Sequence, residues 1–315
     1  MIDTITSEAW CVVEHEYPAE NQLEAENKFT LNNGKICQSG NFEEFSSGET
    51  YPRTHMARIF AGNTIDNLGV NHLANLPNWT RMNVRLNAEM LDLSQCDIKY
   101  FHRTLNQKKG FLERNFEIET TSNHQLEIST LRFLSLDQPE IGVIKYFVKS
   151  INFEGRISFS PVVYGDFNNA DPEWNVLQSK TQKDVAHLWI QTRKTNFQVC
   201  EALSYDFFKN NTQIKVNPTK IEKQKVAGFS FGADLKKGES VCVYKFVALL
   251  SSLDHPYMEL TTRACEMALN AKNSGWSELF NKNYQAWEQK WENSDDKNYQ
   301  NDNYTECMQN QMELH

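Results

Sequence analysis

The stretch "SVCVYKFVALL", residues 240–250, shows the period that decides the fold. Its valines Val241 and Val243 are followed in phase by Val247, and a cysteine, a tyrosine and a phenylalanine alternate with them. Side chains that alternate in this way lie on opposite faces of an extended chain. The stretch therefore predicts a β-strand that is half-buried against a core.

The same period of two recurs through most of residues 80–250. It is present in "MNVRLN" (82–87), "RISFSPVVYG" (156–165) and "FQVCEAL" (197–203). Turn-forming residues such as Gly110 and Gly238 separate the runs, and no helical period intervenes. Many strands at short separation predict a mainly β fold, a large antiparallel sandwich of two sheets.

The period changes near Pro256, where apolar residues begin to recur at helical spacing. Residues 257–275 predict a first helix, because Pro256 suits the first helical turn and Gly275 suits a stop. Residues 276–294 predict a second helix with an aromatic stripe, which belongs to the core or to an interface with another domain. The candidate interface residues of this aromatic stripe are Trp276, Phe280, Tyr284, Trp287 and Trp291.

The composition excludes several classes of protein. The 315 residues carry a net charge of −9, and no cluster of basic residues with interleaved aromatic residues predicts binding to nucleic acid. No apolar run approaches the ~20 residues of a membrane span, and the N-terminus lacks the features of a secretory signal. The seven cysteines are odd in number and widely spaced, which predicts reduced thiols in a cytoplasmic protein.

The segment "NNGKICQSGNFEEF", residues 32–45, contains adjacent carboxylates that could be catalytic acids, Glu43 and Glu44. On an extended strand they would point to opposite faces, so they could not flank one glycosidic bond. Asn33-Gly34 is a strong tight-turn dipeptide, and Gly40 offers a second position for a positive φ. We therefore interpret this segment as a turn that builds the fold.

No motif assigns a catalytic, substrate-binding or metal-binding residue. The eight histidines form neither HxH nor HExxH, and there is no CxxC pair, P-loop, dinucleotide fingerprint or G-x-S-x-G elbow. The sequence thus predicts no metal and no cofactor.

Six stretches, in order, resemble the N-terminal part of glycoside hydrolase family 65. These are "FTLNNGKICQSGNFEEF" (29–45), "NLPNWTRMNVRLNAEMLDL" (75–93), "FHRTLNQKKGFLERNFEI" (101–118), "LRFLSLDQPEIGVIKYFVKSINFEGRISFSP" (131–161), "YKFVALLSSLDH" (244–255) and "AWEQKWENSD" (286–295). The sequence departs from the family pattern at Cys37, where a glycine is usual, and at Ser39, where an arginine is usual.

The resemblance implies a galactose-mutarotase-like super-sandwich in residues 1–255, a helical linker in 256–296 and a polar tail in 297–315 that begins an (α/α)₆ catalytic barrel. Members of the family include inverting phosphorylases of α-linked glucose disaccharides, such as maltose, trehalose and kojibiose phosphorylases, and some relatives hydrolyse instead. The resemblance places the catalytic glutamate and the phosphate site in the barrel. Inorganic phosphate is then the co-substrate of a phosphorylase, and this chain is expected to be inactive alone.

Three functions remain open. The first is support of a missing catalytic barrel, with a possible homodimer. The second is a stand-alone carbohydrate-binding or interaction module. The third is a mutarotase-like sugar enzyme, which requires an acid and a base that face each other in a cleft.

Overall fold

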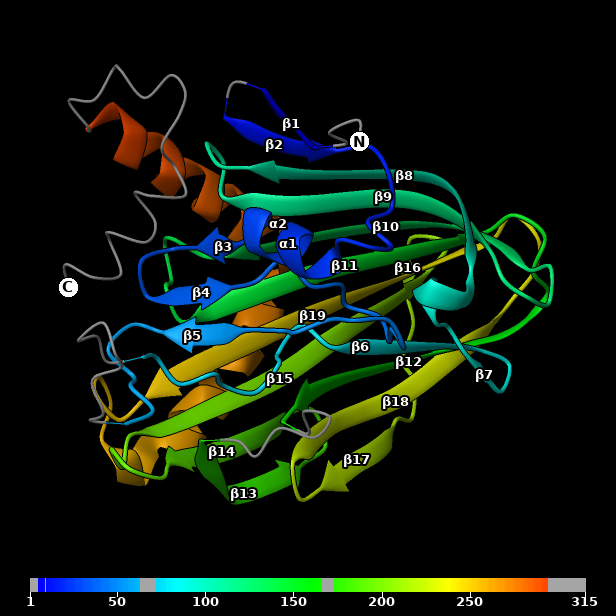
Figure 1. Ribbon diagram of the computed structural model, residues 1–315. Coiled ribbons are helices and arrows are strands. Elements are labelled where there is room, and N and C mark those ends of the chain that lie inside the picture. The colour runs from blue at the N-terminus through cyan, green and yellow to red at the C-terminus, as the bar shows by residue number, and fades with distance from the viewer. Residues whose placement is uncertain (1–4, 9, 63–71, 166–172, 294–315) are drawn as a thin grey trace.

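The computed structural model describes residues 5–8, 10–62, 72–165 and 173–293, and it is a layered β-structure backed by one long helix (Figure 1). The predicted polar tail, 297–315, lies outside the described residues. All paired strands of the described sheets are antiparallel, as the sequence predicts.

The large sheet has eleven strands within the described residues. In spatial order they are β1 (Ile5–Glu8), β2 (Cys11–Glu14), β8 (Asp97–Asn106), β9 (Phe111–Glu119), β10 (Gln125–Leu134), β11 (Ile141–Ser150), β19 (Ser240–Ser251), β15 (Gln198–Lys209), β14 (Ala186–Thr192) and β13 (Trp174–Thr181), with the short β16 (Thr212–Gln213) paired to β15.

Two smaller sheets cover one face of the large sheet, which we call its inner face (Figure 1). One contains β17 (Thr219–Lys223), β18 (Val226–Leu235), β12 (Gly155–Tyr164), β6 (Met82–Leu86) and β7 (Glu89–Met90); the other contains β3 (Leu31–Asn32), β4 (Ile36–Gln38) and β5 (Thr54–Met56). Short helices lie in the connections: α1 (Gln22–Lys28), η1 (Leu93–Gln95) and η2 (Tyr257–Glu259). The third sheet is an addition that the strand period did not predict.

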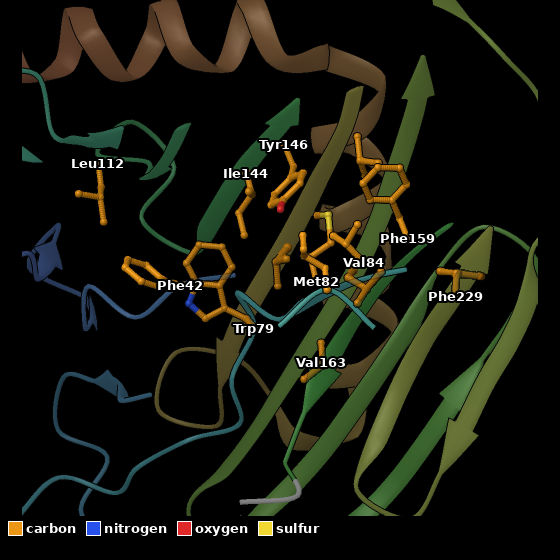
Figure 2. Close-up of a cluster of buried hydrophobic side chains, with 14 of the residues drawn as sticks. Phe42, Trp79, Met82, Val84, Leu112, Ile144, Tyr146, Phe159, Val163 and Phe229 are labelled. Atoms are coloured by element: carbon orange, nitrogen blue, oxygen red, sulfur yellow. The ribbon is translucent and has the colours of Figure 1, made fainter. Parts of the chain in front are cut away.

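The main core lies between the inner face and the smaller sheets. Figure 2 shows Ile144 and Tyr146 of the large sheet beside Met82 and Val84 of β6, and all four are fully buried. The alternating apolar positions of the sequence thus meet in one continuous core.

The helix α2 (Leu260–Glu292) covers the opposite, outer face of the large sheet. Its buried residues Leu260, Ala264 and Ala268 pack in one cluster with Phe246 and other outward-facing side chains of the strands. The prediction of half-buried strands is therefore wrong for β19, which is buried on both faces because α2 covers its outer side.

The two predicted helices meet at Gly275. This residue has φ 77° and ψ 164°, values that interrupt the helix and change its direction. The stop predicted at Gly275 is a kink between two helical halves, so the prediction of a large antiparallel sandwich followed by two helices is confirmed, with the third sheet as an addition. Glycine suits the position because other residues rarely adopt this φ.

Candidate functional site

The turn in the segment 32–45 joins two distant parts of the chain. The side chain of Asn33 donates hydrogen bonds to the carbonyl oxygens of Ser135 (2.8 Å) and Pro139 (3.0 Å). Its own carbonyl oxygen accepts from the backbone N–H groups of Lys35 and Ile36. One buried asparagine thus closes the β3–β4 turn and binds it to the β10–β11 turn.

The two glycines of this segment have different roles. Gly34 has φ 89°, as the tight-turn prediction requires, but Gly40 does not have a positive φ, so that part of the prediction is wrong. A Cβ atom on Gly40 would lie 2.5 Å from Cβ of Phe29. Glycine is required at position 40 because the chain passes so close to the end of α1, where its N–H donates to Glu26 O at 2.7 Å.

The side chains of Glu43 and Glu44 both point toward the guanidinium group of Arg114, so the prediction that they lie on opposite faces is wrong. Each places a carboxylate oxygen 2.7 Å from Nη2 of Arg114. Arg132 also binds Glu43 at 2.9 Å, and the hydroxyl of Tyr146 donates to Glu44 at 2.5 Å. The carboxylates converge because this part of the chain is a bend and not an extended strand.

Glu43 and Glu44 are each only 2% exposed. Burial by itself raises the pKa of Glu43, but the charges of Arg132 and Arg114 outweigh it and hold that pKa below its usual value. A general acid must reach its substrate and hold a proton to give. Paired with arginine and enclosed in the core, these glutamates are fit to hold the fold together and not to cleave a glycosidic bond.

A third buried arginine extends this network. Arg103 pairs with Glu14 of β2 at 2.6 Å and donates to the carbonyl oxygen of Gly40 at 2.9 Å. Its guanidinium lies 4.0 Å from the ring centroid of Phe29. We call the three arginines from β8, β9 and β10 the arginine ladder; it consists of Arg103, Arg114 and Arg132.

Lys245 is a fourth buried cation on the inner face, and like the arginines it binds backbone carbonyl oxygens. Its ammonium group donates to three backbone carbonyl oxygens, those of Trp79 (2.5 Å), Arg81 (2.9 Å) and Val162 (2.8 Å). Burial lowers the pKa of Lys245 to about 7. This lysine joins β19 to β12 and to the loop that precedes β6.

Sequence reasoning missed these four cations, although a signal was present. Arg103 is in phase with Phe101 and Leu105, and Lys245 is in phase with the valines of its strand. A cation at a core-facing position of a strand needs a buried partner, so the phase alone could have identified them.

The first part of the aromatic stripe packs on the outer face of the sheet. The ring of Trp276 contacts the rings of Phe133 and Tyr244, with centroid distances of 5.5 and 5.6 Å. Phe280 contacts Phe133 and Phe111 in the same way. These two candidate interface residues therefore contact their own sandwich.

The second part of the stripe rests on the β8–β9 turn. A Cβ atom on Gly110 would lie 1.9 Å from Nε1 of Trp287, so the ring lies directly on the backbone of that turn. Trp291 donates to Lys108 O at 2.8 Å and packs on Trp10. The ammonium group of Lys109 lies 5.2 Å from the ring centroid of Tyr284, whose hydroxyl also forms a hydrogen bond with the side chain of Glu288. Contact of the stripe with a second domain stays a prediction.

A buried amide fixes the second half of α2. Asn283, fully buried, donates to Lys109 O at 3.2 Å and accepts from the N–H of Leu136 at 2.9 Å. The helix is thereby bound to the β8–β9 and β10–β11 turns at once.

A pocket of about 210 Å³ lies at the far end of the sandwich, by β7 and η1. It is lined by Leu86, Glu89, Met90, Leu91, Asp92, Gln95, Cys96, Thr120 and Thr121. Asp92 already accepts from Ser47 and Ser94, and Glu89 from Thr121 and Ser122. Its carboxylates are thus engaged with neighbouring groups of the chain itself.

Among the described residues, no three His, Cys, Asp or Glu side chains lie together as a metal ion would require. None of the helices in the described parts of the chain combines the length and apolar character that a membrane crossing needs.

Comparison with known proteins gives the family. The family model described as "Glycosyl hydrolase family 65, N-terminal domain" matches residues 12–290. An α,α-trehalose phosphorylase from Thermoanaerobacter brockii is 25% identical over 91% of this chain and 40% of its own length. A maltose phosphorylase from Bacillus subtilis (strain 168) is 23% identical over 91% of this chain and 39% of its own length.

A solved structure agrees with the fold. The protein named "Putative kojibiose phosphorylase from human microbiome" aligns with a TM-score of 0.79 at 17% identity, over 90% of this chain and 38% of that one. This chain therefore spans about two fifths of the length of these three relatives. Because the family model matches well over half of the chain, the chain belongs to glycosyl hydrolase family 65 and corresponds to the N-terminal domain of that family.

Proposed function

We propose that this chain is the non-catalytic sandwich of a larger enzyme that cleaves α-linked glucose disaccharides, with inorganic phosphate as the co-substrate. The observation that carries the proposal is coverage: the N-terminal domain model matches residues 12–290, while the chain spans 40% of the trehalose phosphorylase. A domain of this kind supports and positions a catalytic domain that follows it.

The chemistry of the described residues supports the same proposal. The adjacent carboxylates that the sequence offered as acids, Glu43 and Glu44, are buried and paired with arginine. The two carboxylates that line the pocket, Asp92 and Glu89, accept hydrogen bonds from the hydroxyl groups of Ser94 and Thr121. Glu43 and Glu44 therefore hold the sandwich together through Arg114.

The test compares the 315-residue chain with the product of the complete reading frame. Both are assayed with trehalose, kojibiose and maltose, with and without phosphate. We expect cleavage only by the longer protein and only when phosphate is present. Cleavage by the 315-residue chain, or a reading frame that ends at His315, would overturn the proposal.

Calorimetry distinguishes support from carbohydrate binding. The 315-residue chain is titrated with the same disaccharides at millimolar concentration. We expect no heat beyond dilution, because a supporting domain has no sugar to hold. Saturable heat would favour a binding module instead.

A further inference from the structure

A thiol, an imidazole and an amide form a chain of hydrogen bonds where α2 meets the edge of the large sheet. Sγ of Cys265 lies 3.4 Å from Nδ1 of His187, and Nε2 of the same ring lies 2.8 Å from Oε1 of Gln178. Three elements supply the three groups: α2, β14 and β13. A nucleophile, a base and a third group that orients the base are the parts of an activated nucleophile.

The hydrogen bond to Gln178 fixes the form of the imidazole. An amide oxygen only accepts, so Nε2 of His187 carries the ring proton and donates it. Nδ1 of the ring is then an acceptor, and the thiol of Cys265 donates to it. The proton of the thiol is therefore already directed at the group that would remove it.

The strand register places this chain of groups on the outer face of the sheet. His187, 2% exposed, pairs with Ala202 of β15, which belongs to the apolar cluster under α2. The first half of α2 passes behind β15 and β14 in Figure 1, and the partly exposed Cys265 packs against that cluster. Gln178 is exposed on β13, the last strand of this sheet in the described part of the chain. Solvent therefore reaches the site from the edge of the sheet.

The thiol and the imidazole are both uncharged at neutral pH. Burial raises the pKa of the Cys265 thiol to about 11, and the charge of Glu266 acts in the same direction. Burial also lowers the pKa of His187, and the charge of Lys180 adds to this effect. The opposing charges, Lys180 for the thiol and Glu222 for the imidazole, have smaller effects. Attack by Cys265 therefore requires that His187 takes the proton as the new bond forms.

Two other thiols show what sets Cys265 apart. Cys200 lies in the same cluster but is fully buried, so a reagent in solution does not reach it. Cys96 is partly exposed, and its thiol donates to the carbonyl oxygen of Asp92 at 3.2 Å. Burial raises the pKa of Cys96 to about 12, and a carbonyl oxygen is no base at neutral pH. Cys265 combines access with a base.

We propose that Cys265 is a reactive thiol that exchanges with small disulfides, with His187 as its general base and Gln178 as the residue that positions the base. The proton of Cys265 passes to Nδ1 of His187 while the sulfur attacks one sulfur of the disulfide. The S–S bond of the reagent breaks, a mixed disulfide forms on Cys265, and the departing thiolate takes the proton from His187. One disulfide is consumed and one is formed, so no further oxidant is needed. This site is independent of the proposed function.

Two other kinds of chemistry need more than these groups offer. Acyl transfer also needs hydrogen-bond donors aimed at a developing oxyanion. A metal site needs further ligands, and among the described residues no three His, Cys, Asp or Glu side chains are grouped to hold one. Thiol–disulfide exchange needs a thiol, a base and access, which this site has.

Competitive labelling tests the proposal. The 315-residue chain is treated at neutral pH with a small amount of a dipyridyl disulfide, and mass spectrometry of its peptides measures the label on each cysteine. We expect Cys265 to react at least about tenfold faster than Cys96, because general-base catalysis acts only at Cys265. Equal rates at the two thiols would overturn the proposal.

His187→Asn separates a base from a hydrogen-bond acceptor. The asparagine amide can accept from the thiol but cannot take its proton. Labelling of Cys265 should slow at least about tenfold, while labelling of Cys96 stays the same and reports that the variant is folded. An unchanged rate at Cys265 would mean that His187 only holds α2 in place, and the proposal would fail.

The exposed position 178 gives a variant that puts folding at little risk. Gln178→Leu removes the acceptor that orients the imidazole, and labelling of Cys265 should slow severalfold. Gln178→Glu keeps an acceptor at the same place and should retain at least the wild-type rate. Equal rates in these two variants would contradict the positioning role of Gln178.

Discussion

The two faces of the large sheet are covered in different ways. On the inner face, the irregular segment around Glu43 is held by the arginine ladder and by charge-assisted hydrogen bonds. On the outer face, α2 is held by alanine, leucine and aromatic side chains, with Asn283 as the buried polar contact of its second half. Both interfaces are buried, yet one is charged and the other is apolar.

The difference follows from the backbone that is being held. A helix satisfies its own hydrogen bonds, so apolar packing is enough to dock it. The irregular segment around Glu43 makes few backbone hydrogen bonds to neighbouring strands, so its carbonyl oxygens need other donors. Arg132 supplies them to Asn41 O and Ser39 O at 2.7 and 2.8 Å, and Arg103 supplies one to Gly40 O. The buried arginines of the inner face thus supply hydrogen bonds that a regular strand or helix would receive from its own backbone.

The largest effect should come from removal of Arg114. Arg114→Met leaves Glu43 and Glu44 buried without their shared partner, and we expect a loss of about 3–5 kcal/mol in the free energy of unfolding. Urea denaturation measures it. The matched control Lys149→Met breaks an exposed pair with Glu127 and should cost less than about 1 kcal/mol. Equal losses in the two variants would mean that the buried ion pairs of Arg114 contribute no more to stability than an exposed ion pair does.

The inner face should also respond to pH through Lys245. Its folded pKa of about 7 lies below its unfolded value, so the unfolded state binds more protons between those values. Burial of the charged ammonium group of Lys245 destabilises the folded state below about pH 7, and this destabilisation is relieved as the pH rises toward about 10. The unfolding free energy of the wild type, minus that of Lys245→Met, should therefore increase over this range. A flat or falling difference would contradict a buried charge at Lys245.

On the outer face, Gly110→Ala tests the contact with Trp287. The added methyl group meets the indole ring, and we expect a loss of about 1–3 kcal/mol together with faster hydrogen exchange in the second half of α2. Gly34→Ala is the control, because Gly34 also has positive φ but nothing within 4 Å of the added carbon. If the two variants match in both measurements, strain alone explains the loss and the contact is unimportant.

Removal of the Asn283 amide should have an effect no larger than that of Gly110→Ala. Asn283→Ala leaves the buried N–H of Leu136 and the carbonyl oxygen of Lys109 without this partner, and thermal or urea unfolding should show a loss of about 1–3 kcal/mol. Gln285→Ala, at an exposed position of the same helix, should change stability by less than about 0.5 kcal/mol. A neutral Asn283→Ala would mean that aromatic packing alone docks the helix.

The sequence predicted the regular parts of the fold well. The period of two in β19 and β12, the helical period after Pro256 and the break at Gly275 are all local signals, and each corresponds to an observed element. The prediction that β19 is half-buried was wrong, because burial of its second face depends on where α2 packs. No local pattern contains that information.

The polar contacts were harder to predict. The convergence of Glu43 and Glu44 depends on a bend, and the need for glycine at position 40 depends on the nearby end of α1. Both depend on the tertiary structure and have no local sequence signal. The turn at Asn33-Gly34 was predictable because its geometry is set within a few residues. The prediction that the aromatic stripe meets a second domain is open, although most of its rings already pack on this one.

The most direct test of the central claim is a cleavage assay on the purified 315-residue chain with trehalose, kojibiose and maltose in phosphate buffer. If the glutamates and arginines of this chain build a support and perform no chemistry, the release of glucose and glucose phosphate equals that of buffer. Release above buffer that is lost in a folded Glu43→Gln or Glu44→Gln variant would contradict the account.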